Sequence, residues 1–174
     1  INSDMNQRIL YLDEDQLPSL VEFLPIENYE LLRKYPENFE GGRRLIDLEI
    51  RKLSYTKINN AFKNILIPYQ QVRYESIPDE NLKHHFAYGN DICFISGMIE
   101  DQHNHKIVTE LSLFKGYFNI NNCKFTENQV TNLAHAIFKL CQEEKLILFD
   151  WETRKVIKLT TSKAVENYLN KNQS

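Results

Sequence analysis

The chain has 174 residues, of which 42% are hydrophobic and 11% aromatic, and its formal net charge is −3. A chain of this length can bury a sizeable core without disulfides or metals, and its apolar content excludes intrinsic disorder. The slightly acidic balance gives no support to a general nucleic-acid binder, which carries a basic footprint. We therefore expect one domain over residues 1–174.

The cysteine pattern and the hydropathy predict a cytoplasmic protein. Cys93, Cys123 and Cys141 are odd in number and form no C-x-x-C pair. We interpret them as reduced structural thiols, because zinc and redox sites come with paired spacings. No apolar run approaches the ~18 residues that span a bilayer, and residues 1–10 lack the apolar segment of a signal peptide.

Residues 11–42 are predicted to form two short helices. Asp15 can cap the first helix, and Pro25 ends it. The second covers residues 27–35 and stops before Pro36, because the residue preceding a proline avoids the helical conformation. The segment is also acidic, with eight carboxylates against two basic side chains.

Residues 43–73 reverse this charge, with seven basic residues against two acidic ones. The apolar side chains of residues 58–66 follow helical spacing. Residues 46–53 fit a backward extension of that helix but also alternate like a strand, so both structures stay open for them. On this pattern, residues 1–68 form a helical part of the domain.

Beyond the helical part, the apolar period changes towards two. Residues 72–74 alternate, and residues 78–89 have the composition of a connecting loop or a short helical turn. Residues 92–98 and 107–113 each place their apolar side chains on one face. The polar turn at 101–105 between them predicts an antiparallel hairpin.

The clearest element is a helix over residues 126–142. Thr126 and Gln129 form a capping box at its start, and apolar residues then recur at steps of three and four. Two short apolar runs at 146–149 and 156–157 predict a second hairpin.

A closing helix over residues 162–170 completes the order of elements. We predict an α+β fold, with a helical part over residues 1–68 and an antiparallel sheet of about four to six strands packed with helices over residues 69–174. The strands lack the alternation with helices that is typical of a parallel sheet. The five glycines form no phosphate-binding loop, which argues against a usual nucleotide site.

His103 and His105 are the best metal candidates, because residues i and i+2 of an extended segment point the same way. Glu100 or Asp101 could supply a third ligand. The pair lies in the predicted hairpin turn, however, where polar side chains are normally solvated. We predict no bound metal and no cofactor.

The remaining histidines give a second chemical alternative. His85 beside Tyr88 and Asp91 could assemble the acid–base site of a nuclease. His135 lies beside the apolar stripe of the long helix, and we interpret it as structural. Nothing in these spacings demands catalysis, so we predict no catalytic residue and a protein that is not an enzyme.

A partner-binding surface is the third possibility. Trp151, the only tryptophan, follows Asp150 at a strand end, and tryptophan is enriched at binding hot spots. The acidic segment would attract a basic partner and raise its association rate if its carboxylates converge in space. The predicted partner-binding residues are Asp13, Glu14, Asp15, Glu22, Glu27 and Trp151.

The end of the chain resembles the C-terminal part of some bacterial immunity proteins of contact-dependent growth inhibition and related toxin systems. The resemblance covers about thirty residues and consists of the apolar run 146–149 with Trp151, the run 156–157, and the helix around 165–169. It implies a non-enzymatic cytoplasmic protein that binds one cognate toxin, often a basic nuclease domain, and blocks its active site. No residue set of such a family transfers to this chain.

Two alternatives remain beside an immunity or inhibitor protein. One is a small hydrolase or nuclease that depends on histidine or a metal, which requires at least two of the histidines to converge. The other is a regulatory adaptor that binds nucleic acid through a basic face. The basic side chains that this face requires are Arg43, Arg44, Arg51 and Lys52.

Overall fold

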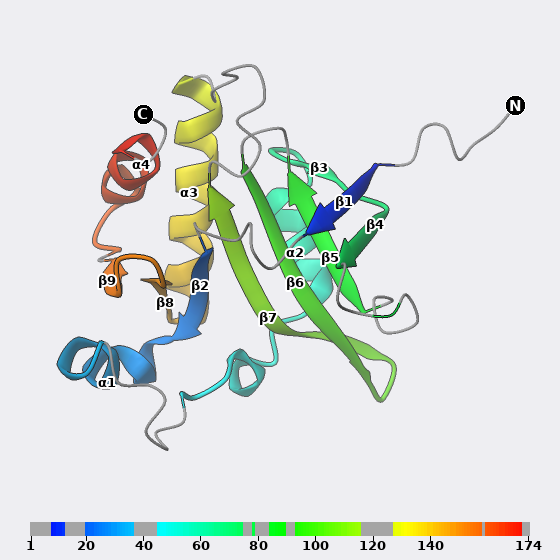
Figure 1. The fold of residues 1–174 in the computed structure, drawn as a ribbon, viewed down its shortest axis with the longest axis horizontal. Helices are drawn as coiled ribbons and strands as arrows, with labels where there is room; N and C mark the ends of the chain where they lie inside the picture. The colour runs from blue at the N-terminus through cyan, green and yellow to red at the C-terminus, as the bar shows by residue number, and fades with distance from the viewer. Residues whose placement is uncertain are drawn as a thin grey trace, which may run out of the picture.

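A computed structural model describes residues 8–12, 20–36, 45–74, 78, 84–89, 93–115, 127–157 and 159–171. Within these residues the fold is α+β, with a seven-stranded antiparallel sheet in the order β3-β5-β6-β7-β2-β8-β9, a parallel pair β1-β4 and four α-helices (Figure 1). The strands are β1 (Ile9–Leu12), β2 (Leu20–Pro25), β3 (Ile67–Pro68), β4 (Gln71–Tyr74), β5 (His85–Gly89), β6 (Cys93–Gln102), β7 (His105–Lys115), β8 (Leu146–Asp150) and β9 (Lys155–Ile157). The helices are α1 (Tyr29–Lys34), α2 (Tyr55–Phe62), α3 (Glu127–Glu144) and α4 (Ser162–Lys171).

The long hairpin β6–β7 forms the middle of the sheet, as the sequence predicts. Its two-residue turn is made by His103 and Asn104, whose φ angles of 51° and 67° are typical of the tight turns that suit twisted hairpins. Figure 1 shows the two strands running together to a tip that projects away from the helices. Both residues of the turn are exposed.

Strand β2 corrects the prediction of a first helix that ends before Pro25. Leu20–Pro25 lies between β7 and β8 and pairs antiparallel with both. Val21 and Phe23 pack in the same core as the helices, whereas Leu24 packs in a separate cluster with α1. The alternation is therefore that of a strand. The structure does not confirm a helical part over residues 1–68, because β1, β2 and β3 lie within it.

The helices α2, α3 and α4 cover one face of the sheet, and α4 packs on α3 (Figure 1). Helix α3 confirms the predicted long helix, although Thr126 and its capping role lie outside the described residues. The helix buries Ala136 and Leu140 in addition to the predicted stripe, because it is covered from two sides, while Phe138 is only partly buried. None of the helices in the described residues is long and apolar enough to cross a membrane.

The other face of the sheet is covered by two separate clusters. The ribbon β1-β4 contributes Leu10, Leu12 and Val72, which pack with Phe94 and Phe114 of the central hairpin. Helix α1 packs over β2 and β8 through a cluster that includes Leu24, Leu32, Ile147 and Phe149. In register between these clusters lie polar residues, with Glu22 opposite Ser112 and Ser112 opposite Ser96.

Residues 46–53 adopt neither of the structures left open for them. Leu48–Arg51 is a 3₁₀ helix, and Lys52 ends it in the left-handed conformation at φ 48°. Helix α2 starts separately after Ser54, whose side-chain oxygen accepts a hydrogen bond from the backbone N–H of Lys57. The segment predicted as a loop at 78–89 also needs correction, because His85–Gly89 is strand β5. Strands β2 and β5 were both missed by the sequence analysis, and for this reason the sheet has more strands than the predicted four to six.

Candidate partner-binding cleft

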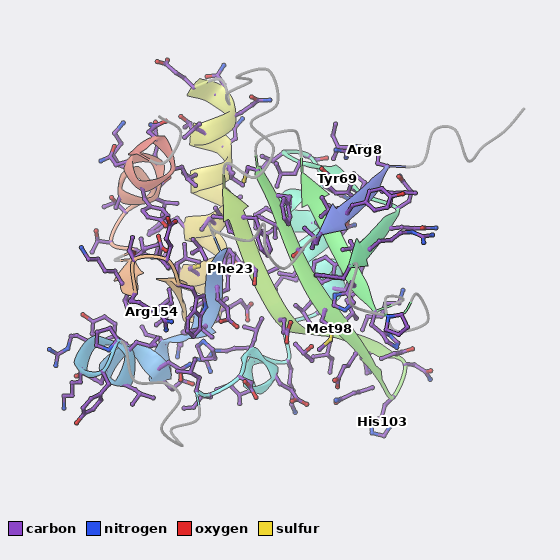
Figure 2. The ribbon with its side chains drawn as sticks, viewed as in Figure 1. Arg8, Phe23, Tyr69, Met98, His103 and Arg154 are labelled. Atoms are coloured by element: carbon purple, nitrogen blue, oxygen red, sulfur yellow. The ribbon has the colours of Figure 1, made fainter. Side chains whose placement is uncertain are left out.

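A cleft of about 220 Å³ opens on the sheet face away from α3, between β2, the 3₁₀ helix and the central hairpin. Phe23 and Met98, labelled in Figure 2, mark two of the strands that line it. None of the described residues lining this acidic cleft is basic. Five carboxylate side chains line it, from Glu22, Asp47, Glu49, Glu100 and Glu110.

A β-bulge in the central hairpin places Glu110 in the acidic cleft. Met98 pairs with Glu110, but the next residue, Ile99, pairs with Val108, so Thr109 is the extra residue of β7. Without the bulge, residues 108 and 110 would share a face of the sheet. Instead Val108 is buried in the helix-side core and Glu110 lines the cleft.

The segment before the 3₁₀ helix supplies the opposite wall. The side-chain amide of Asn28 donates to the carbonyl oxygen of Ile46 at 2.8 Å and accepts from its backbone N–H at 2.7 Å. This double hydrogen bond fixes the chain so that Asp47 and Glu49 line the cleft. On either side of them in the chain, Ile46 and Ile50 remain 40% and 50% exposed.

An amide links two of the carboxylates. The Nε2 atom of Gln102 lies 3.3 Å from Oε1 of Glu49 and 3.2 Å from Oε2 of Glu100. One neutral donor thus serves two acidic side chains that come from different elements. A neutral amide cannot cancel their charges, so the negative potential of the cleft persists.

Glu22 meets the only tryptophan. The Nε1–H of Trp151 donates a hydrogen bond of 2.9 Å to Oε2 of Glu22. Burial raises the pKa of Glu22, the hydrogen bond from Trp151 lowers it, and the nearby carboxylates of Glu110 and Asp47 raise it further, so that the net shift is upward. The carboxyl group therefore holds its proton to a higher pH than an ordinary glutamate.

The indole of Trp151 is also held by its own strand end. It packs edge-on against the Phe149 ring, with centroids 4.9 Å apart. The guanidinium of Arg154, labelled in Figure 2, lies 5.2 Å from the centre of the indole ring. Trp151 is half-buried, which gives it one fixed side and one accessible side.

The predicted site residues are only partly brought together. Glu22 and Trp151, 129 positions apart, are in direct contact. Glu27 lies elsewhere and pairs with Arg51, whose hydrogen bond lowers the pKa of that carboxyl. The predicted residues Asp13, Glu14 and Asp15 lie outside the described residues.

Sequence reasoning missed most of the cleft. The sequence did not single out Asp47 and Glu49, because they are the two acids of an otherwise basic segment. It did not single out Glu110, because this residue is one of the polar residues that alternate with apolar ones along a strand. Glu100 was noted only as a possible metal ligand. Glu100 pairs with Ile107 and Glu110 with Met98, and a register shift separates these two pairs, so the sequence carried no signal that the two acids lie on one face.

The histidines do not converge among the described residues. The ring of His85 packs at a tilt against that of Tyr74, with centroids 5.1 Å apart, whereas Tyr88 packs in the core of the other face. His103 and His105 are exposed at the hairpin turn, and His135 is exposed on α3 instead of being a packed structural residue. No group of three His, Cys, Asp or Glu side chains in the described ranges could hold a metal ion.

The basic face that a nucleic-acid adaptor requires is not assembled by the described residues. The side chain of Arg51 donates to the carbonyl oxygen of Glu144 at 2.8 Å and pairs with Glu27. Arg51 is therefore committed to fixing the end of α3. Lys52 is exposed, and Arg43 and Arg44 lie outside the described residues.

No protein-family model, curated protein or solved structure matches this chain. The likeness of its C-terminal residues to immunity proteins therefore stays a resemblance. Function is therefore inferred from the acidic cleft and from the side chains around it.

Proposed function

We propose that this chain is a cytoplasmic immunity or inhibitor protein that binds a cognate bacterial toxin with a basic nuclease domain and blocks its active site. The observation that carries the proposal is the convergence of five carboxylates on one cleft, with no basic side chain among its described lining residues. Nuclease surfaces that bind phosphates are positively charged. An acidic cleft offers such a surface a substitute for the phosphate backbone.

The distribution of ion pairs supports this proposal. The acidic and basic segments of the sequence neutralise each other elsewhere, as in the pair of Arg51 with Glu27, and Lys57 pairs with Glu144 of α3. Arg51 and Lys57, which follow Asp47 and Glu49 in the chain, are thus engaged outside the cleft. Carboxylates left together repel one another, and a cationic partner relieves that repulsion.

Apolar side chains beside the acidic cleft fit the usual anatomy of a protein interface. Exposed Ile46 and Ile50 come from the segment that supplies Asp47 and Glu49. Trp151 is half-buried and touches Glu22. A rigid aromatic side chain and aliphatic contacts supply most of the affinity in such interfaces, whereas charges mainly set the association rate and the choice of partner.

The test begins by isolating the partner from the native host with the intact protein as bait. Stopped-flow association with that partner is then compared between the wild type and a Glu49→Gln/Glu100→Gln variant at low and at physiological salt. The matched control is Glu127→Gln/Glu143→Gln, which removes the same charge from exposed positions on α3.

We expect the cleft variant to associate roughly 3–10-fold more slowly at low salt and to show a weaker salt dependence, because electrostatic steering acts on the encounter. The control should stay close to the wild type. Equal association rates for the two variants, or a partner that carries no basic surface, would refute the proposal.

A further inference from the structure

A second cleft opens at the edge of the sheet, where β9 stops short of the start of β8. Strand β9 pairs with the last three residues of β8, and its own last residue, Ile157, lies opposite Leu148. The first two residues of β8, Leu146 and Ile147, pair with β2 on one side and have no strand on the other side among the described residues. A cleft of about 740 Å³, here called the apolar edge cleft, lies at this gap.

The apolar edge cleft has the size and the lining of a small-molecule site. It lies where α1, β9 and the end of α3 meet (Figure 1). Tyr29 of α1 and Ile26 just before it line one part, and Ile157 and Leu159 line another. Ile26 is 48% exposed and is thus a large aliphatic side chain that the fold leaves uncovered. Clefts of about 300–1,000 Å³ with mostly apolar linings and a few polar groups are typical of sites for small ligands.

Lys145 is the one basic residue among the described residues that line this cleft. Its backbone is fixed in the left-handed conformation at φ 55°. Its carbonyl oxygen accepts a hydrogen bond from the backbone N–H of Ile26 at 2.9 Å and another from the guanidinium of Arg51 at 3.2 Å. These bonds hold the residue at the wall of the cleft, while its side chain is exposed.

The charges beside Lys145 leave an excess of positive charge. The two carboxylates that line the cleft are both paired within the chain, Glu27 with Arg51 and Glu30 with Arg33. Glu27 also interacts electrostatically with Lys145. One carboxylate therefore faces two cations at this end of the cleft, and an added anion would balance the second one.

We propose that the apolar edge cleft binds a small amphiphilic anion, with its apolar body between α1 and β9 and its anionic group, such as a carboxylate, at Lys145. The site lies beyond the proposed function, because it shares no lining residue with the acidic cleft and has the opposite charge preference. The unpaired edge of β8 is two residues long, which is too short to hold an added strand. A small molecule therefore fits the gap better than an extended peptide.

The first experiment titrates the protein with anilinonaphthalene sulfonate, an apolar anion whose fluorescence rises in apolar surroundings. The cleft variants are Ile26→Glu and Lys145→Gln, both at exposed positions. The matched controls are Ile67→Glu, at an isoleucine that is 58% exposed outside the cleft, and Lys63→Gln, at an exposed lysine outside it. Circular dichroism establishes that all four variants are folded.

We expect saturable binding of one probe molecule per chain in the wild type and in both controls. Ile26→Glu should weaken binding about tenfold or more, because it replaces an apolar contact with a like charge. Lys145→Gln should weaken it roughly 2–5-fold, the usual contribution of an exposed ion pair. Absence of saturable binding, or cleft variants that bind as tightly as their controls, overturns the proposal.

The second experiment tests the preference for an anion by displacing the bound probe with decanoate or with decanol. Decanoate should displace it at a lower concentration than decanol in the wild type, and Lys145→Gln should reduce this difference. Equal displacement by the two compounds in the wild type overturns the anionic preference. Self-association of the free protein that is lost in Ile26→Glu also overturns the proposal, because a second copy of the chain would then occupy the cleft.

Discussion

The hydrogen bond between Trp151 and Glu22 provides the sharpest test of the site. Trp151→Phe keeps an aromatic ring against Phe149 and removes the indole N–H donor. A hydrogen bond to a charged group contributes roughly 1.5–3 kcal/mol, and a partly buried acceptor left without its donor costs about 1–3 kcal/mol. We therefore expect Trp151→Phe to lower the free energy of unfolding by about 2 kcal/mol at pH 7.

The matching variant is Glu22→Met, which removes the acceptor and keeps a side chain of similar length. In this background the loss of the indole N–H deletes no hydrogen bond to Glu22, so Trp151→Phe should cost about 1 kcal/mol or less. Urea denaturation followed by circular dichroism gives all four free energies of the double-mutant cycle. A coupling energy below about 0.5 kcal/mol would mean that the hydrogen bond contributes little, and that Trp151 is held by packing alone.

The pH dependence of stability should carry the signature of Glu22. Its pKa is raised in the folded protein, so the unfolded chain loses the proton first as pH rises, and the folded state becomes relatively less stable above the ordinary value of 4.5. Glu22→Gln removes this penalty and keeps an oxygen for the indole. Its stability relative to the wild type should rise between pH 4.5 and 7.5, and a difference independent of pH would refute the argument.

The remaining predictions concern packing. Gly97→Ala should cost about 1–3 kcal/mol or more in a urea titration, because a Cβ there would lie 2.3 Å from the backbone oxygen of Glu110 and 2.6 Å from Cζ of Phe86, both rigid neighbours. Ile137→Ala should lower the free energy of unfolding by about 2–5 kcal/mol, because this side chain of α3 is fully buried. Phe138→Ala should cost less than Ile137→Ala in the same titration, and the reverse order would mean that α3 is rotated.

Local patterns predicted the long helix and the central hairpin well, because their apolar residues keep a regular spacing. Apolar residues recur at steps of three and four along α3, and they alternate along β6 and β7 although parts of both faces of this hairpin are buried. Strand β2 was misread because it is covered on both faces, by the helices at Val21 and Phe23 and by α1 at Leu24. A strand buried on both sides reads as a continuous apolar run, and its spacing fits a helix equally well.

For the candidate site, the sequence predicted some of the residues that take part but not how they are arranged. The sequence singled out Glu22 and Trp151, but nothing in it indicated that they touch, because their contact depends on β2 lying beside β8. The position of Glu110 in the cleft depends on a β-bulge, and no residue type in the sequence predicts this bulge. Asp47 enters the cleft through hydrogen bonds between Asn28 and the neighbouring backbone, which is a tertiary effect.

The central position of β2 also constrains how the protein can be made. During synthesis Leu20–Pro25 leaves the ribosome well before its partner β7, and β8 follows roughly 120 residues behind it, which at ~5–20 residues per second is a delay of about 6–24 s. Until β7 emerges, Val21 and Phe23 have no strand to pair with, and the other edge of β2 stays unpaired until β8 follows. The nascent chain therefore completes the pairing of β2 only after β8 emerges, and β2 is the segment of the sheet that waits longest for both of its neighbours.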